Sequence, residues 1–518
     1  MNGTTGSSQH LGDKSATRPV PSPALPDRLA RRLSWAAATG ILTSIAIMIA
    51  AAAVRNSWEH PYVVMPPDGM PWSSPLHVSL TLVSAALWTA VVLAAGGVTA
   101  GLAAVARGAR PSVRLVLGAG LVAVAVLTVL PGAGSNDTLD YAAFGRLVVL
   151  GHNPYVMTPD QLRHLGDPVG LATPLTWGKL RTVYGPLATA EQWAAASLGG
   201  TSAARIVFWL KLWNALAFLA VALGLDRLLR SDPARRLRAH LLWTVNPLLL
   251  WGLVTEGHVD VMAAAAGFLG LAVLRKRGDG DPGALRGLAA GLLVGTAADL
   301  KITYVLFGVA LAWAARNWMA TWFSAAAGAA LVLIPSYLWF GPPAARALLS
   351  RDGQASIGNF YQTLIGSHQV IVPHLLLLGG LASAAIAVLV LKRLPDGVPD
   401  LPAIRPALAL SVAWLFMWPY QFPWYDAMPI CLLALYPVSR LDWLVLIRLA
   451  AGTFALMPGN AGFPAQPVLN AITKAGLYYL APGVLLAAAA ALVWLCVTRR
   501  WRMDPPTVIP AVGLRVPA

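Results

Sequence analysis

Residues 115–155, LVLGAGLVAVAVLTVLPGAGSNDTLDYAAFGRLVVLGHNPY, join an apolar run to a short polar segment. The run is about long enough to cross a bilayer as a helix. The polar segment after it contains two acids, an arginine, a histidine and an Asn-Pro turn signal. Ionisable residues at membrane depth are costly and usually serve a function. The segment is therefore the first place to look for a site.

The composition extends this pattern to the whole chain of 518 residues. Hydrophobic residues make up 57% of it and charged residues 12%, whereas soluble domains contain about a quarter charged residues. Separate apolar runs of roughly 17–25 residues recur along the chain. We predict an all-α polytopic membrane protein with about 14 transmembrane helices.

The net charge of +16 comes from basic residues that cluster in short loops between the apolar runs. This distribution is typical of cytoplasmic loops under the positive-inside rule, and it argues against nucleic acid as a partner. The same rule places both termini in the cytoplasm of a plasma-membrane protein. Cys431 and Cys496 lie in separate apolar runs, so neither a disulfide framework nor a cysteine metal cluster is indicated.

The chain divides into three parts. Residues 1–33 are polar and rich in Ser, Pro and Gly, which predicts a disordered cytoplasmic tail. Residues 34–498 form the predicted transmembrane domain, and residues 499–518 form a second cytoplasmic tail. Within the domain, residues 132–202 are expected to be a long outer loop with interfacial helices at 137–150 and 186–199.

The polar residues at the ends of the predicted spans all fall on the outer side of this topology. Several lie one or two residues inside an apolar run, which favours a cavity at the outer leaflet boundary over open water. These polar residues include His152 and Asp426. The candidate site residues among them are Asp137, Asp140, Arg146, Tyr184, Glu256, His258, Asp260, Lys301, Gln421, Trp424 and Tyr425.

Asp137 is the leading candidate for a catalytic group. If a helix begins near it, Asp137, Asp140, Tyr141 and Phe144 share one face. A carboxylate at the mouth of a cavity is suited to act as a general base. The alternative is that Ser135, Asn136 or Asp137 caps the helix.

The other candidates each have a structural alternative. TEGHVD (255–260) suggests contacts to sugar hydroxyls, although a metal site stays open despite spacing that is not standard for zinc. Lys301 is either the ion-pair partner of Asp299 or a cation for a phosphate. QFPWYD (421–426) suits stacking on a sugar, or belongs to an aromatic belt. Arg146 is either a solvated interfacial group or a second phosphate contact. GLLVG (291–295) is a GxxxG helix-packing motif.

The order of these motifs resembles a known family. An outer acid after an early span, then NPY, YGP, NP, GHxD, a later lysine turn and PWY are similar to the actinobacterial polyprenyl-phosphate-sugar-dependent glycosyltransferases of the GT-C fold. SNDTLDYAAFGRLVVLGHNPY looks most like the α-(1→6)-mannopyranosyltransferases that build the mannan of lipomannan in the cell envelope. The resemblance extends over about 115–500.

The resemblance implies a donor, an acceptor and a base. The donor is polyprenyl-phosphate-mannose, and the acceptor is a lipid-anchored mannan or phosphatidylinositol mannoside. The first-loop acid, here Asp137, is the implied base of an inverting transfer, with no metal or other cofactor expected. Asp140, Glu256, His258 and Asp260 are then expected to bind sugar hydroxyls, and Lys301 and Arg146 the lipid phosphate.

Two alternatives come from other classes. A transporter or flippase for a lipid-linked sugar would share the apolar spans, but it should show inverted repeats and polar groups accessible from both sides. The sequence shows no convincing repeat between its halves. A GT-C enzyme that uses another sugar, such as arabinofuranose, fits the same residues.

Overall fold

The computed structural model describes residues 27–54, 76, 78–173, 178–276, 280–347, 355–361, 373–395, 398, 400–457, 466–499 and 501. Within these ranges the regular elements are helices and none is a β-strand, so the predicted all-α class is confirmed. Most of the two predicted tails, 1–33 and 499–518, lies outside the described residues. The first helix begins at Arg28, ahead of the expected start of the first span, because the Asp27 side chain accepts a hydrogen bond from the Ala30 N–H.

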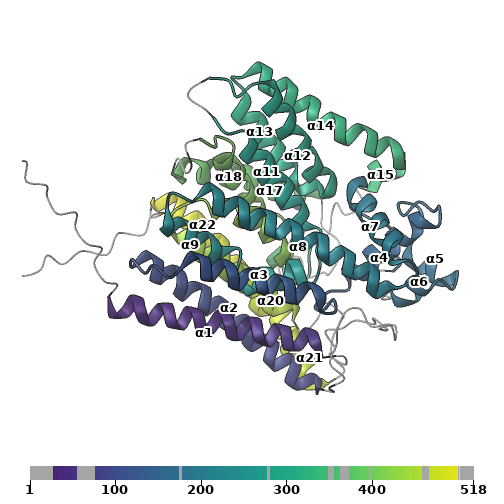
Figure 1. Ribbon diagram of the computed structural model, residues 1–518, viewed down its shortest axis with the longest axis horizontal. Helices are drawn as coiled ribbons and strands as arrows, with labels where there is room; N and C mark the ends of the chain where they lie inside the picture. Colours follow the sequence, from purple (N-terminus) through teal and green to yellow (C-terminus); the bar gives the residue numbers. More distant parts are fainter. Residues whose placement is uncertain are drawn as a thin grey trace, which may run out of the picture.

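The described part of the N-terminal half combines long helices with a group of short ones and a broken segment (Figure 1). Its elements are α1 (Arg28–Ala53), α2 (Leu80–Ala106), α3 (Val113–Val129), α4 (Asp137–Val149), α5 (Pro159–His164), α6 (Pro168–Ala172), α7 (Pro186–Gly199), α8 (Ala203–Leu228), α9 (Pro233–Leu242), α10 (Pro247–Leu249), the π-helix η1 (Leu250–Thr255) and α11 (Asp260–Val273).

The C-terminal half continues the bundle. Its elements are α12 (Ala284–Leu300), the short 3₁₀ helix η2 (Ile302–Tyr304), α13 (Val305–Ala315), α14 (Met319–Phe340), α15 (Pro342–Ala347), α17 (Pro373–Arg393), α18 (Ile404–Met417), the 3₁₀ helix η3 (Pro423–Asp426), α19 (Ala427–Leu433), α20 (Arg440–Leu456), α21 (Pro467–Ala475), the π-helix η4 (Gly476–Leu480) and α22 (Ala481–Thr498).

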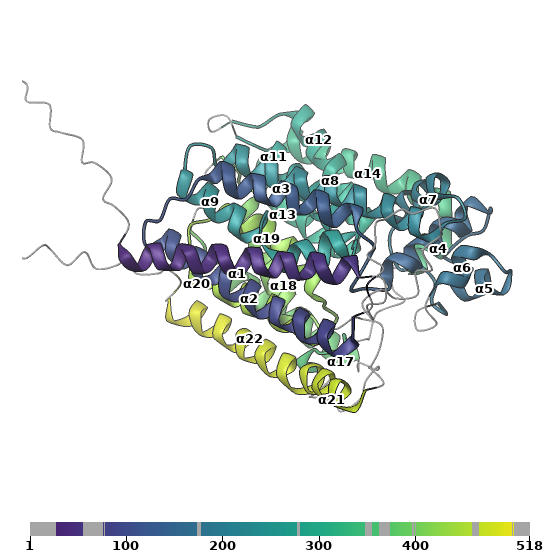
Figure 2. The same ribbon diagram turned by 60° about the horizontal axis from the view of Figure 1, so that its bottom comes forward.

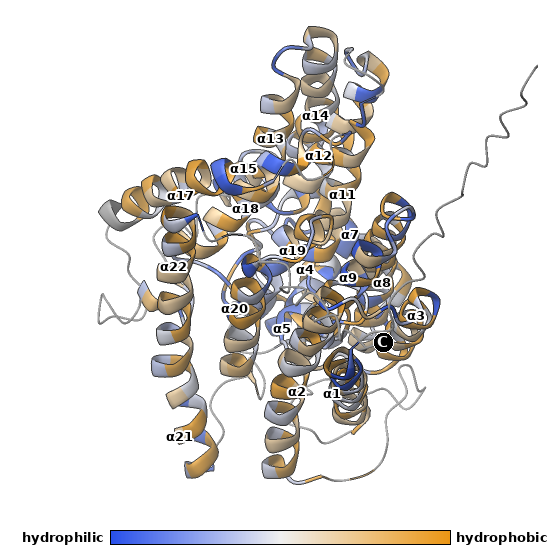
Figure 3. Ribbon diagram, turned by 90° about the vertical axis from the view of Figure 1, so that its left-hand side faces the viewer, coloured by the Kyte–Doolittle hydropathy of each residue, from blue (hydrophilic) through white to orange (hydrophobic). Residues whose placement is uncertain are grey.

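Six helical segments of the described chain are long and apolar enough to cross a membrane. They are α1, α2, α8, α14, residues 376–393 of α17, and the continuous stretch α21 to α22. A pair of helices bent by 109°, residues 247–255 and 260–273, raises the number to seven if it is one span. Figure 3 shows hydrophobic residues along the long helices and hydrophilic ones mainly at helix ends and connections. The expected 14 spans and the GT-C fold stay predictions.

Two predicted interfacial helices are present as helices. The pieces expected at 137–150 and 186–199 are α4 and α7. With α5 and α6 they gather at one end of the long helices, in both Figure 1 and Figure 2. The break at 256–259 and the turn at Lys301 connect helices that pack in the adjoining bundle, since α11 packs against α12 and α12 against α7.

The GxxxG motif packs two helices as expected. A Cβ on Gly291 would lie 2.0 Å from the Ala325 carbonyl oxygen, and one on Gly295 would lie 2.8 Å from the Ala329 Cα. Both partners belong to α14. Glycine is therefore required at these two positions because the backbones of α12 and α14 approach so closely.

Lys211 of α8 determines how the chain enters α4. Its side chain is fully buried, and its Nζ donates to the carbonyl oxygens of Leu127, Leu130 and Pro131 at 2.7, 2.6 and 3.2 Å. Carbonyls at the end of a helix lack partners within the helix, and a cation there also interacts favourably with the helix dipole. Lys211 thus stabilises the end of α3 and the turn toward Asp137.

Replacing Lys211 by Met should lower the thermal stability of the detergent-solubilised protein. Three buried carbonyls would lose their donor, and we expect a loss of about 2–4 kcal/mol because each unsatisfied buried polar group costs about 1–3 kcal/mol. Arg205→Met, at an exposed position of the same helix, is the control and should change little. An unfolding temperature of Lys211→Met equal to that of the wild type would contradict this role.

Candidate active site

A cavity of about 310 Å³ lies between α4, the segment before α7, the turn at Lys301 and the region around η3. The predicted face of α4 forms one wall, because Asp137, Asp140, Tyr141 and Phe144 all line the cavity. The remaining lining residues are Leu180, Arg181, Val183, Tyr184, Lys301, Ile302, Thr303, Ala347, Leu376, Trp414, Trp418, Tyr420, Phe422, Trp424 and Tyr425.

Asp137 is the first residue of α4. Its backbone N–H donates to the Ser135 Oγ at 3.2 Å, and the N-cap Asn136 makes no side-chain capping bond. The Ser135 hydroxyl thus caps the first N–H of α4, as one of the capping alternatives predicted, and 19% of the Asp137 side chain is exposed. Two acids in the first turn, Asp137 and Asp140, suit the positive end of the helix dipole.

The surroundings of these two acids change their protonation. Burial raises the pKa of Asp137 above its ordinary value, and the nearby His258 only partly opposes this. Burial and the charge of Asp137 together raise the pKa of Asp140 well above its ordinary value. The Asp140 Oδ1 is buried and has no hydrogen-bond partner in the described part of the protein.

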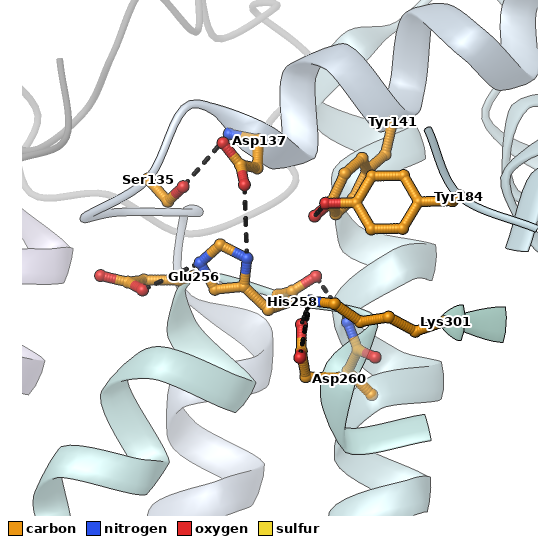
Figure 4. A network of polar contacts seen from close by, with 10 residues as sticks. Ser135, Asp137, Tyr141, Tyr184, Glu256, His258, Asp260 and Lys301 are labelled. Atoms are coloured by element: carbon orange, nitrogen blue, oxygen red, sulfur yellow. Dashed lines mark hydrogen bonds and ion pairs between the residues drawn. The ribbon is translucent and has the colours of Figure 1, made fainter. Parts of the chain in front are cut away.

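The His258 ring lies between Asp137 and Glu256 (Figure 4). The His258 Nδ1 is 3.6 Å from the Asp137 Oδ2, and its Nε2 is 3.1 Å from the Glu256 Oε2. The imidazole is fully buried and stacks on the Trp424 indole, with 3.7 Å between ring centroids and 14° between planes. Neither His258 nor Glu256 lines the main cavity.

A glycine allows this close arrangement. Gly134 has φ +93°, and a Cβ there would lie 2.6 Å from both the Glu256 Oε1 and the Trp251 Nε1. A side chain at this position would therefore collide with Glu256, besides straining the left-handed backbone. The GAGSND segment (132–137) thus packs closely against Glu256, in the break between η1 and α11.

Lys301 supplies a cation to the other side of the cavity. Its Nζ donates to both carboxylate oxygens of Asp260 at 2.7 Å and lies 3.6 Å from the centroid of the Tyr425 ring. The alternative prediction that Lys301 pairs with Asp299 is wrong. The Asp299 Oδ1 instead accepts from the Leu187 N–H at 3.3 Å, because the chain turns between α12 and η2 and sends the two side chains apart.

Tyrosines join the segment before α7 to α4. The hydroxyls of Tyr141 and Tyr184 are 2.7 Å apart, and the Tyr155 O–H donates to the Tyr184 carbonyl oxygen at 2.9 Å. The NPY and YGP segments are therefore in contact. Together these bonds hold the Tyr184 ring against the cavity.

Arg146 and Gln421, like His258 and Glu256, do not line the cavity. Arg146 does not line the cavity, and its Nε donates to the Asp167 Oδ2 at 2.8 Å. Gln421 also lies outside the main cavity, where its Oε1 accepts from Arg448 at 2.8 Å and its Nε2 donates to the Trp414 carbonyl oxygen at 2.9 Å. Gln421 thus supports Trp414, one of the aromatic residues that line the cavity, instead of facing the cavity itself.

Several residues that line the cavity were not predicted from the sequence. The aromatic wall also contains Trp414, Trp418, Tyr420 and Phe422, and its signal was the run WLFMWPYQFPWY at 414–425. Arg181 adds a second cation to the cavity wall. Its position in a loop gave no signal, because nothing in the local sequence shows which way that loop packs.

The cavity has the groups that a sugar phosphate requires. Acids that can accept hydroxyl protons come from α4, cations come from Lys301 and Arg181, and aromatic faces come from the region around η3. Aromatic rings offer apolar faces for stacking, while guanidinium and ammonium groups bind phosphate oxygens. The arrangement can therefore hold a polar, anionic ligand with an apolar tail.

Comparison with known proteins gives one match. Residues 37–317 match a protein-family model described as alpha-(1->6)-mannopyranosyltransferase, N-terminal domain. The match covers more than half of the chain and extends from α1 past Lys301, so it contains Asp137 and the TEGHVD break. No curated protein and no solved structure matches the chain.

Removing only one partner of the Lys301–Asp260 pair should destabilise the protein more than removing both partners. Asp260→Asn leaves a buried ammonium without its counter-charge, and we expect a loss of about 3–5 kcal/mol. The double variant Asp260→Asn/Lys301→Met removes both charges and should regain part of that stability. Thermal unfolding of the wild type, the single variants Asp260→Asn and Lys301→Met, and the double variant gives the coupling energy, and purely additive losses would contradict the pairing.

Proposed function

This chain belongs to the alpha-(1→6)-mannopyranosyltransferase family, and we propose that it transfers mannose from polyprenyl-phosphate-mannose to a lipid-anchored mannan or phosphatidylinositol mannoside. The product has a new α-(1→6) linkage. The proposed fold is GT-C with about 14 transmembrane helices. The proposed site faces the outer side of the plasma membrane, and both termini are cytoplasmic.

The observation that best supports this proposal is the position of Asp137. Its carboxylate is partly exposed in the wall of the cavity. It is held at the start of α4 by a backbone hydrogen bond instead of by bonds to its own oxygens. A general base must lie within reach of the proton that it removes, and Asp137 meets that requirement for a hydroxyl bound in the cavity.

The reaction proposed is a single in-line displacement. The acceptor hydroxyl oxygen attacks C1 of the β-linked mannosyl phosphate, and its proton passes to Asp137. The bond between C1 and the phosphate oxygen breaks, and its electron pair leaves with the phosphate. The new glycosidic bond has the opposite, α configuration. This is the base half of the inverting glycosidase mechanism, with a sugar hydroxyl in place of water.

The leaving phosphate requires positive charge more than an acid. Phosphate departs readily, so fixed cations that receive its charge are sufficient. Lys301 and Arg181 supply such cations from the cavity wall. Because Lys301 is already held by Asp260 and lies over Tyr425, its position does not have to be reorganised when the charge develops.

The cavity favours an enzyme over a transporter. The cavity lies at one end of α13, α17 and α18, where Thr303, Leu376 and Trp418 line it. A transporter needs polar groups that can be reached from both sides of the membrane. Donor sugar, acceptor and metal independence are expectations from the family resemblance, and each has a direct measurement in the assay below.

The substitution Asp137→Asn should strongly reduce the rate of mannose transfer. We expect a fall in rate of about 100-fold or more, since general base catalysis contributes about 10²–10⁴-fold. The assay uses purified full-length protein, polyprenyl-phosphate-[14C]mannose and an α-1,6-dimannoside acceptor, with Asp160→Asn of α5 as the control. Retained transfer by Asp137→Asn would remove the base assignment. Activity with an arabinofuranose donor alone would remove the sugar assignment, and loss of activity with a chelator would remove metal independence.

As the solution is made more acidic, the transfer rate should begin to fall at a pH above the ordinary titration range of aspartate. Burial raises the pKa of Asp137 from its ordinary value of 3.8, with Glu256, His258, Asp260 and Lys301 as its charged neighbours. Only the ionised carboxylate can accept a proton, so kcat/KM should decline as the pH falls through this raised pKa. A rate that stays constant down to the ordinary aspartate range would contradict the assignment.

A further inference from the structure

We propose that a second cavity, at the far end of three helices from the main cavity, binds the phosphate of an anionic ligand, either a lipid head group or a soluble phosphate. This basic cavity has a volume of about 590 Å³. Its lining includes four cations and two tryptophans, which are Lys276, Arg316, Lys392, Arg405, Trp313 and Trp318. Such binding would be independent of the transfer reaction.

The two cavities lie at opposite ends of the same helices. The helix α17 lines the main cavity through Leu376 and the basic cavity through Leu391 and Lys392. The rise from Leu376 to Leu391 is about 22 Å at about 1.5 Å per residue, which is most of the roughly 30 Å hydrocarbon thickness of a bilayer. The helix α18, and α13 together with η2, also line one cavity at each end. In the proposed topology the basic cavity therefore faces the cytoplasm.

The charge of the basic cavity is one-sided. Lys276 follows α11, Arg316 follows α13, Lys392 lies in the last turn of α17, and Arg405 lies in the first turn of α18. None of the described residues that line the cavity is acidic. The positive-inside rule accounts for basic connections between helices, but it does not bring cations from four helix ends to one hollow.

The acid next to Lys276 is turned to another partner. The Asp400 carbonyl oxygen accepts from the Lys276 N–H at 2.8 Å, but the Asp400 carboxylate pairs with Arg275 at 2.9 Å. Arg275 and Asp400 do not line the basic cavity. Within the described part of the chain, Lys276, Arg316 and Lys392 form no ion pair with a carboxylate. Their charge is thus available to a ligand.

Two tryptophans orient two of these cations. The Lys276 Nζ lies 4.7 Å from the Trp318 ring centroid, and the Arg316 guanidinium carbon lies 4.5 Å from that of Trp313. The Arg316 Nη1 also donates to the Trp313 carbonyl oxygen at 2.7 Å. Attraction to an aromatic face positions a cation without cancelling its charge. The guanidinium keeps further N–H donors for phosphate oxygens.

The surface beside the basic cavity favours a lipid as the source of the phosphate. On α13, Val309 and Trp313 are one turn apart and both exposed, and α14 begins at the exposed Met319, directly after Trp318. Val388, about one turn before Lys392 in α17, is also exposed. Acyl chains can lie on these apolar side chains while the head group enters the cavity. Tryptophan is enriched at the membrane interface, and basic pockets between helices bind phospholipid head groups.

The first test measures the unfolding temperature of the full-length protein in phosphatidylcholine nanodiscs with an increasing fraction of phosphatidylglycerol. A ligand that binds the folded state raises the unfolding temperature, so the wild type should be stabilised. Arg316→Gln/Lys392→Gln should bind phosphatidylglycerol about 30-fold more weakly and lose most of this shift, because each cation contributes about fivefold in affinity. Arg405 is kept, since its Nη2 donates to the Leu391 carbonyl oxygen at 2.9 Å and joins α18 to α17.

The matched control is Arg227→Gln/Arg230→Gln, which removes the same charge from exposed positions at the end of α8. The control should keep the full shift. Native mass spectrometry adds a readout that does not depend on stability. The wild type and the control should retain a phosphatidylglycerol molecule that Arg316→Gln/Lys392→Gln has lost. Equal shifts and equal retention in both double variants would overturn the site.

The source of the phosphate is decided by adding inorganic phosphate to the protein in pure phosphatidylcholine. If the ligand is a lipid, phosphatidylglycerol stabilises the wild type and inorganic phosphate does not. If the ligand is soluble, inorganic phosphate stabilises the wild type, and Arg316→Gln/Lys392→Gln loses that response. A wild type that responds to neither ligand would overturn the proposal. None of these measurements uses sugar transfer, so their outcome does not depend on the proposed reaction.

Discussion

The buried ion pair between Lys301 and Asp260 is the interaction on which the rest of the site depends. Lys301 comes from the turn after α12, Asp260 begins α11, and the Tyr304 O–H donates to the Asp260 carbonyl oxygen. The Tyr425 ring of η3 lies against the ammonium. Charges in such surroundings are stable only as a pair, so the pair holds three parts of the chain in one geometry.

The pair also divides the cavity into two chemical sides. Asp137 and Asp140 line the cavity from α4, and Lys301 lines it from the turn after α12. His258 and Glu256 lie against Asp137 without lining the cavity.

Particular residues show which contacts could be predicted from the sequence and which could not. The shared face of Asp137, Asp140, Tyr141 and Phe144 was predicted correctly, because helical spacing alone brings such positions together. The pairing of Lys301 with Asp299 was wrong, because sequence neighbours at the end of a helix need not point the same way. The position of Arg146 against Asp167 had no signal, since the two lie in different short helices and connections.

The sequence by itself determined the helical membrane class, the family, and the acid placed where the chain leaves α3. Each depends on composition or on residues close together in the chain, where hydrophobicity and helical period act locally. Tertiary structure alone decided that His258 stands behind Asp137, that Lys301 meets Asp260, and that the aromatic run closes the cavity. These contacts join distant segments, and their geometry depends on how the helices pack and where each one is broken.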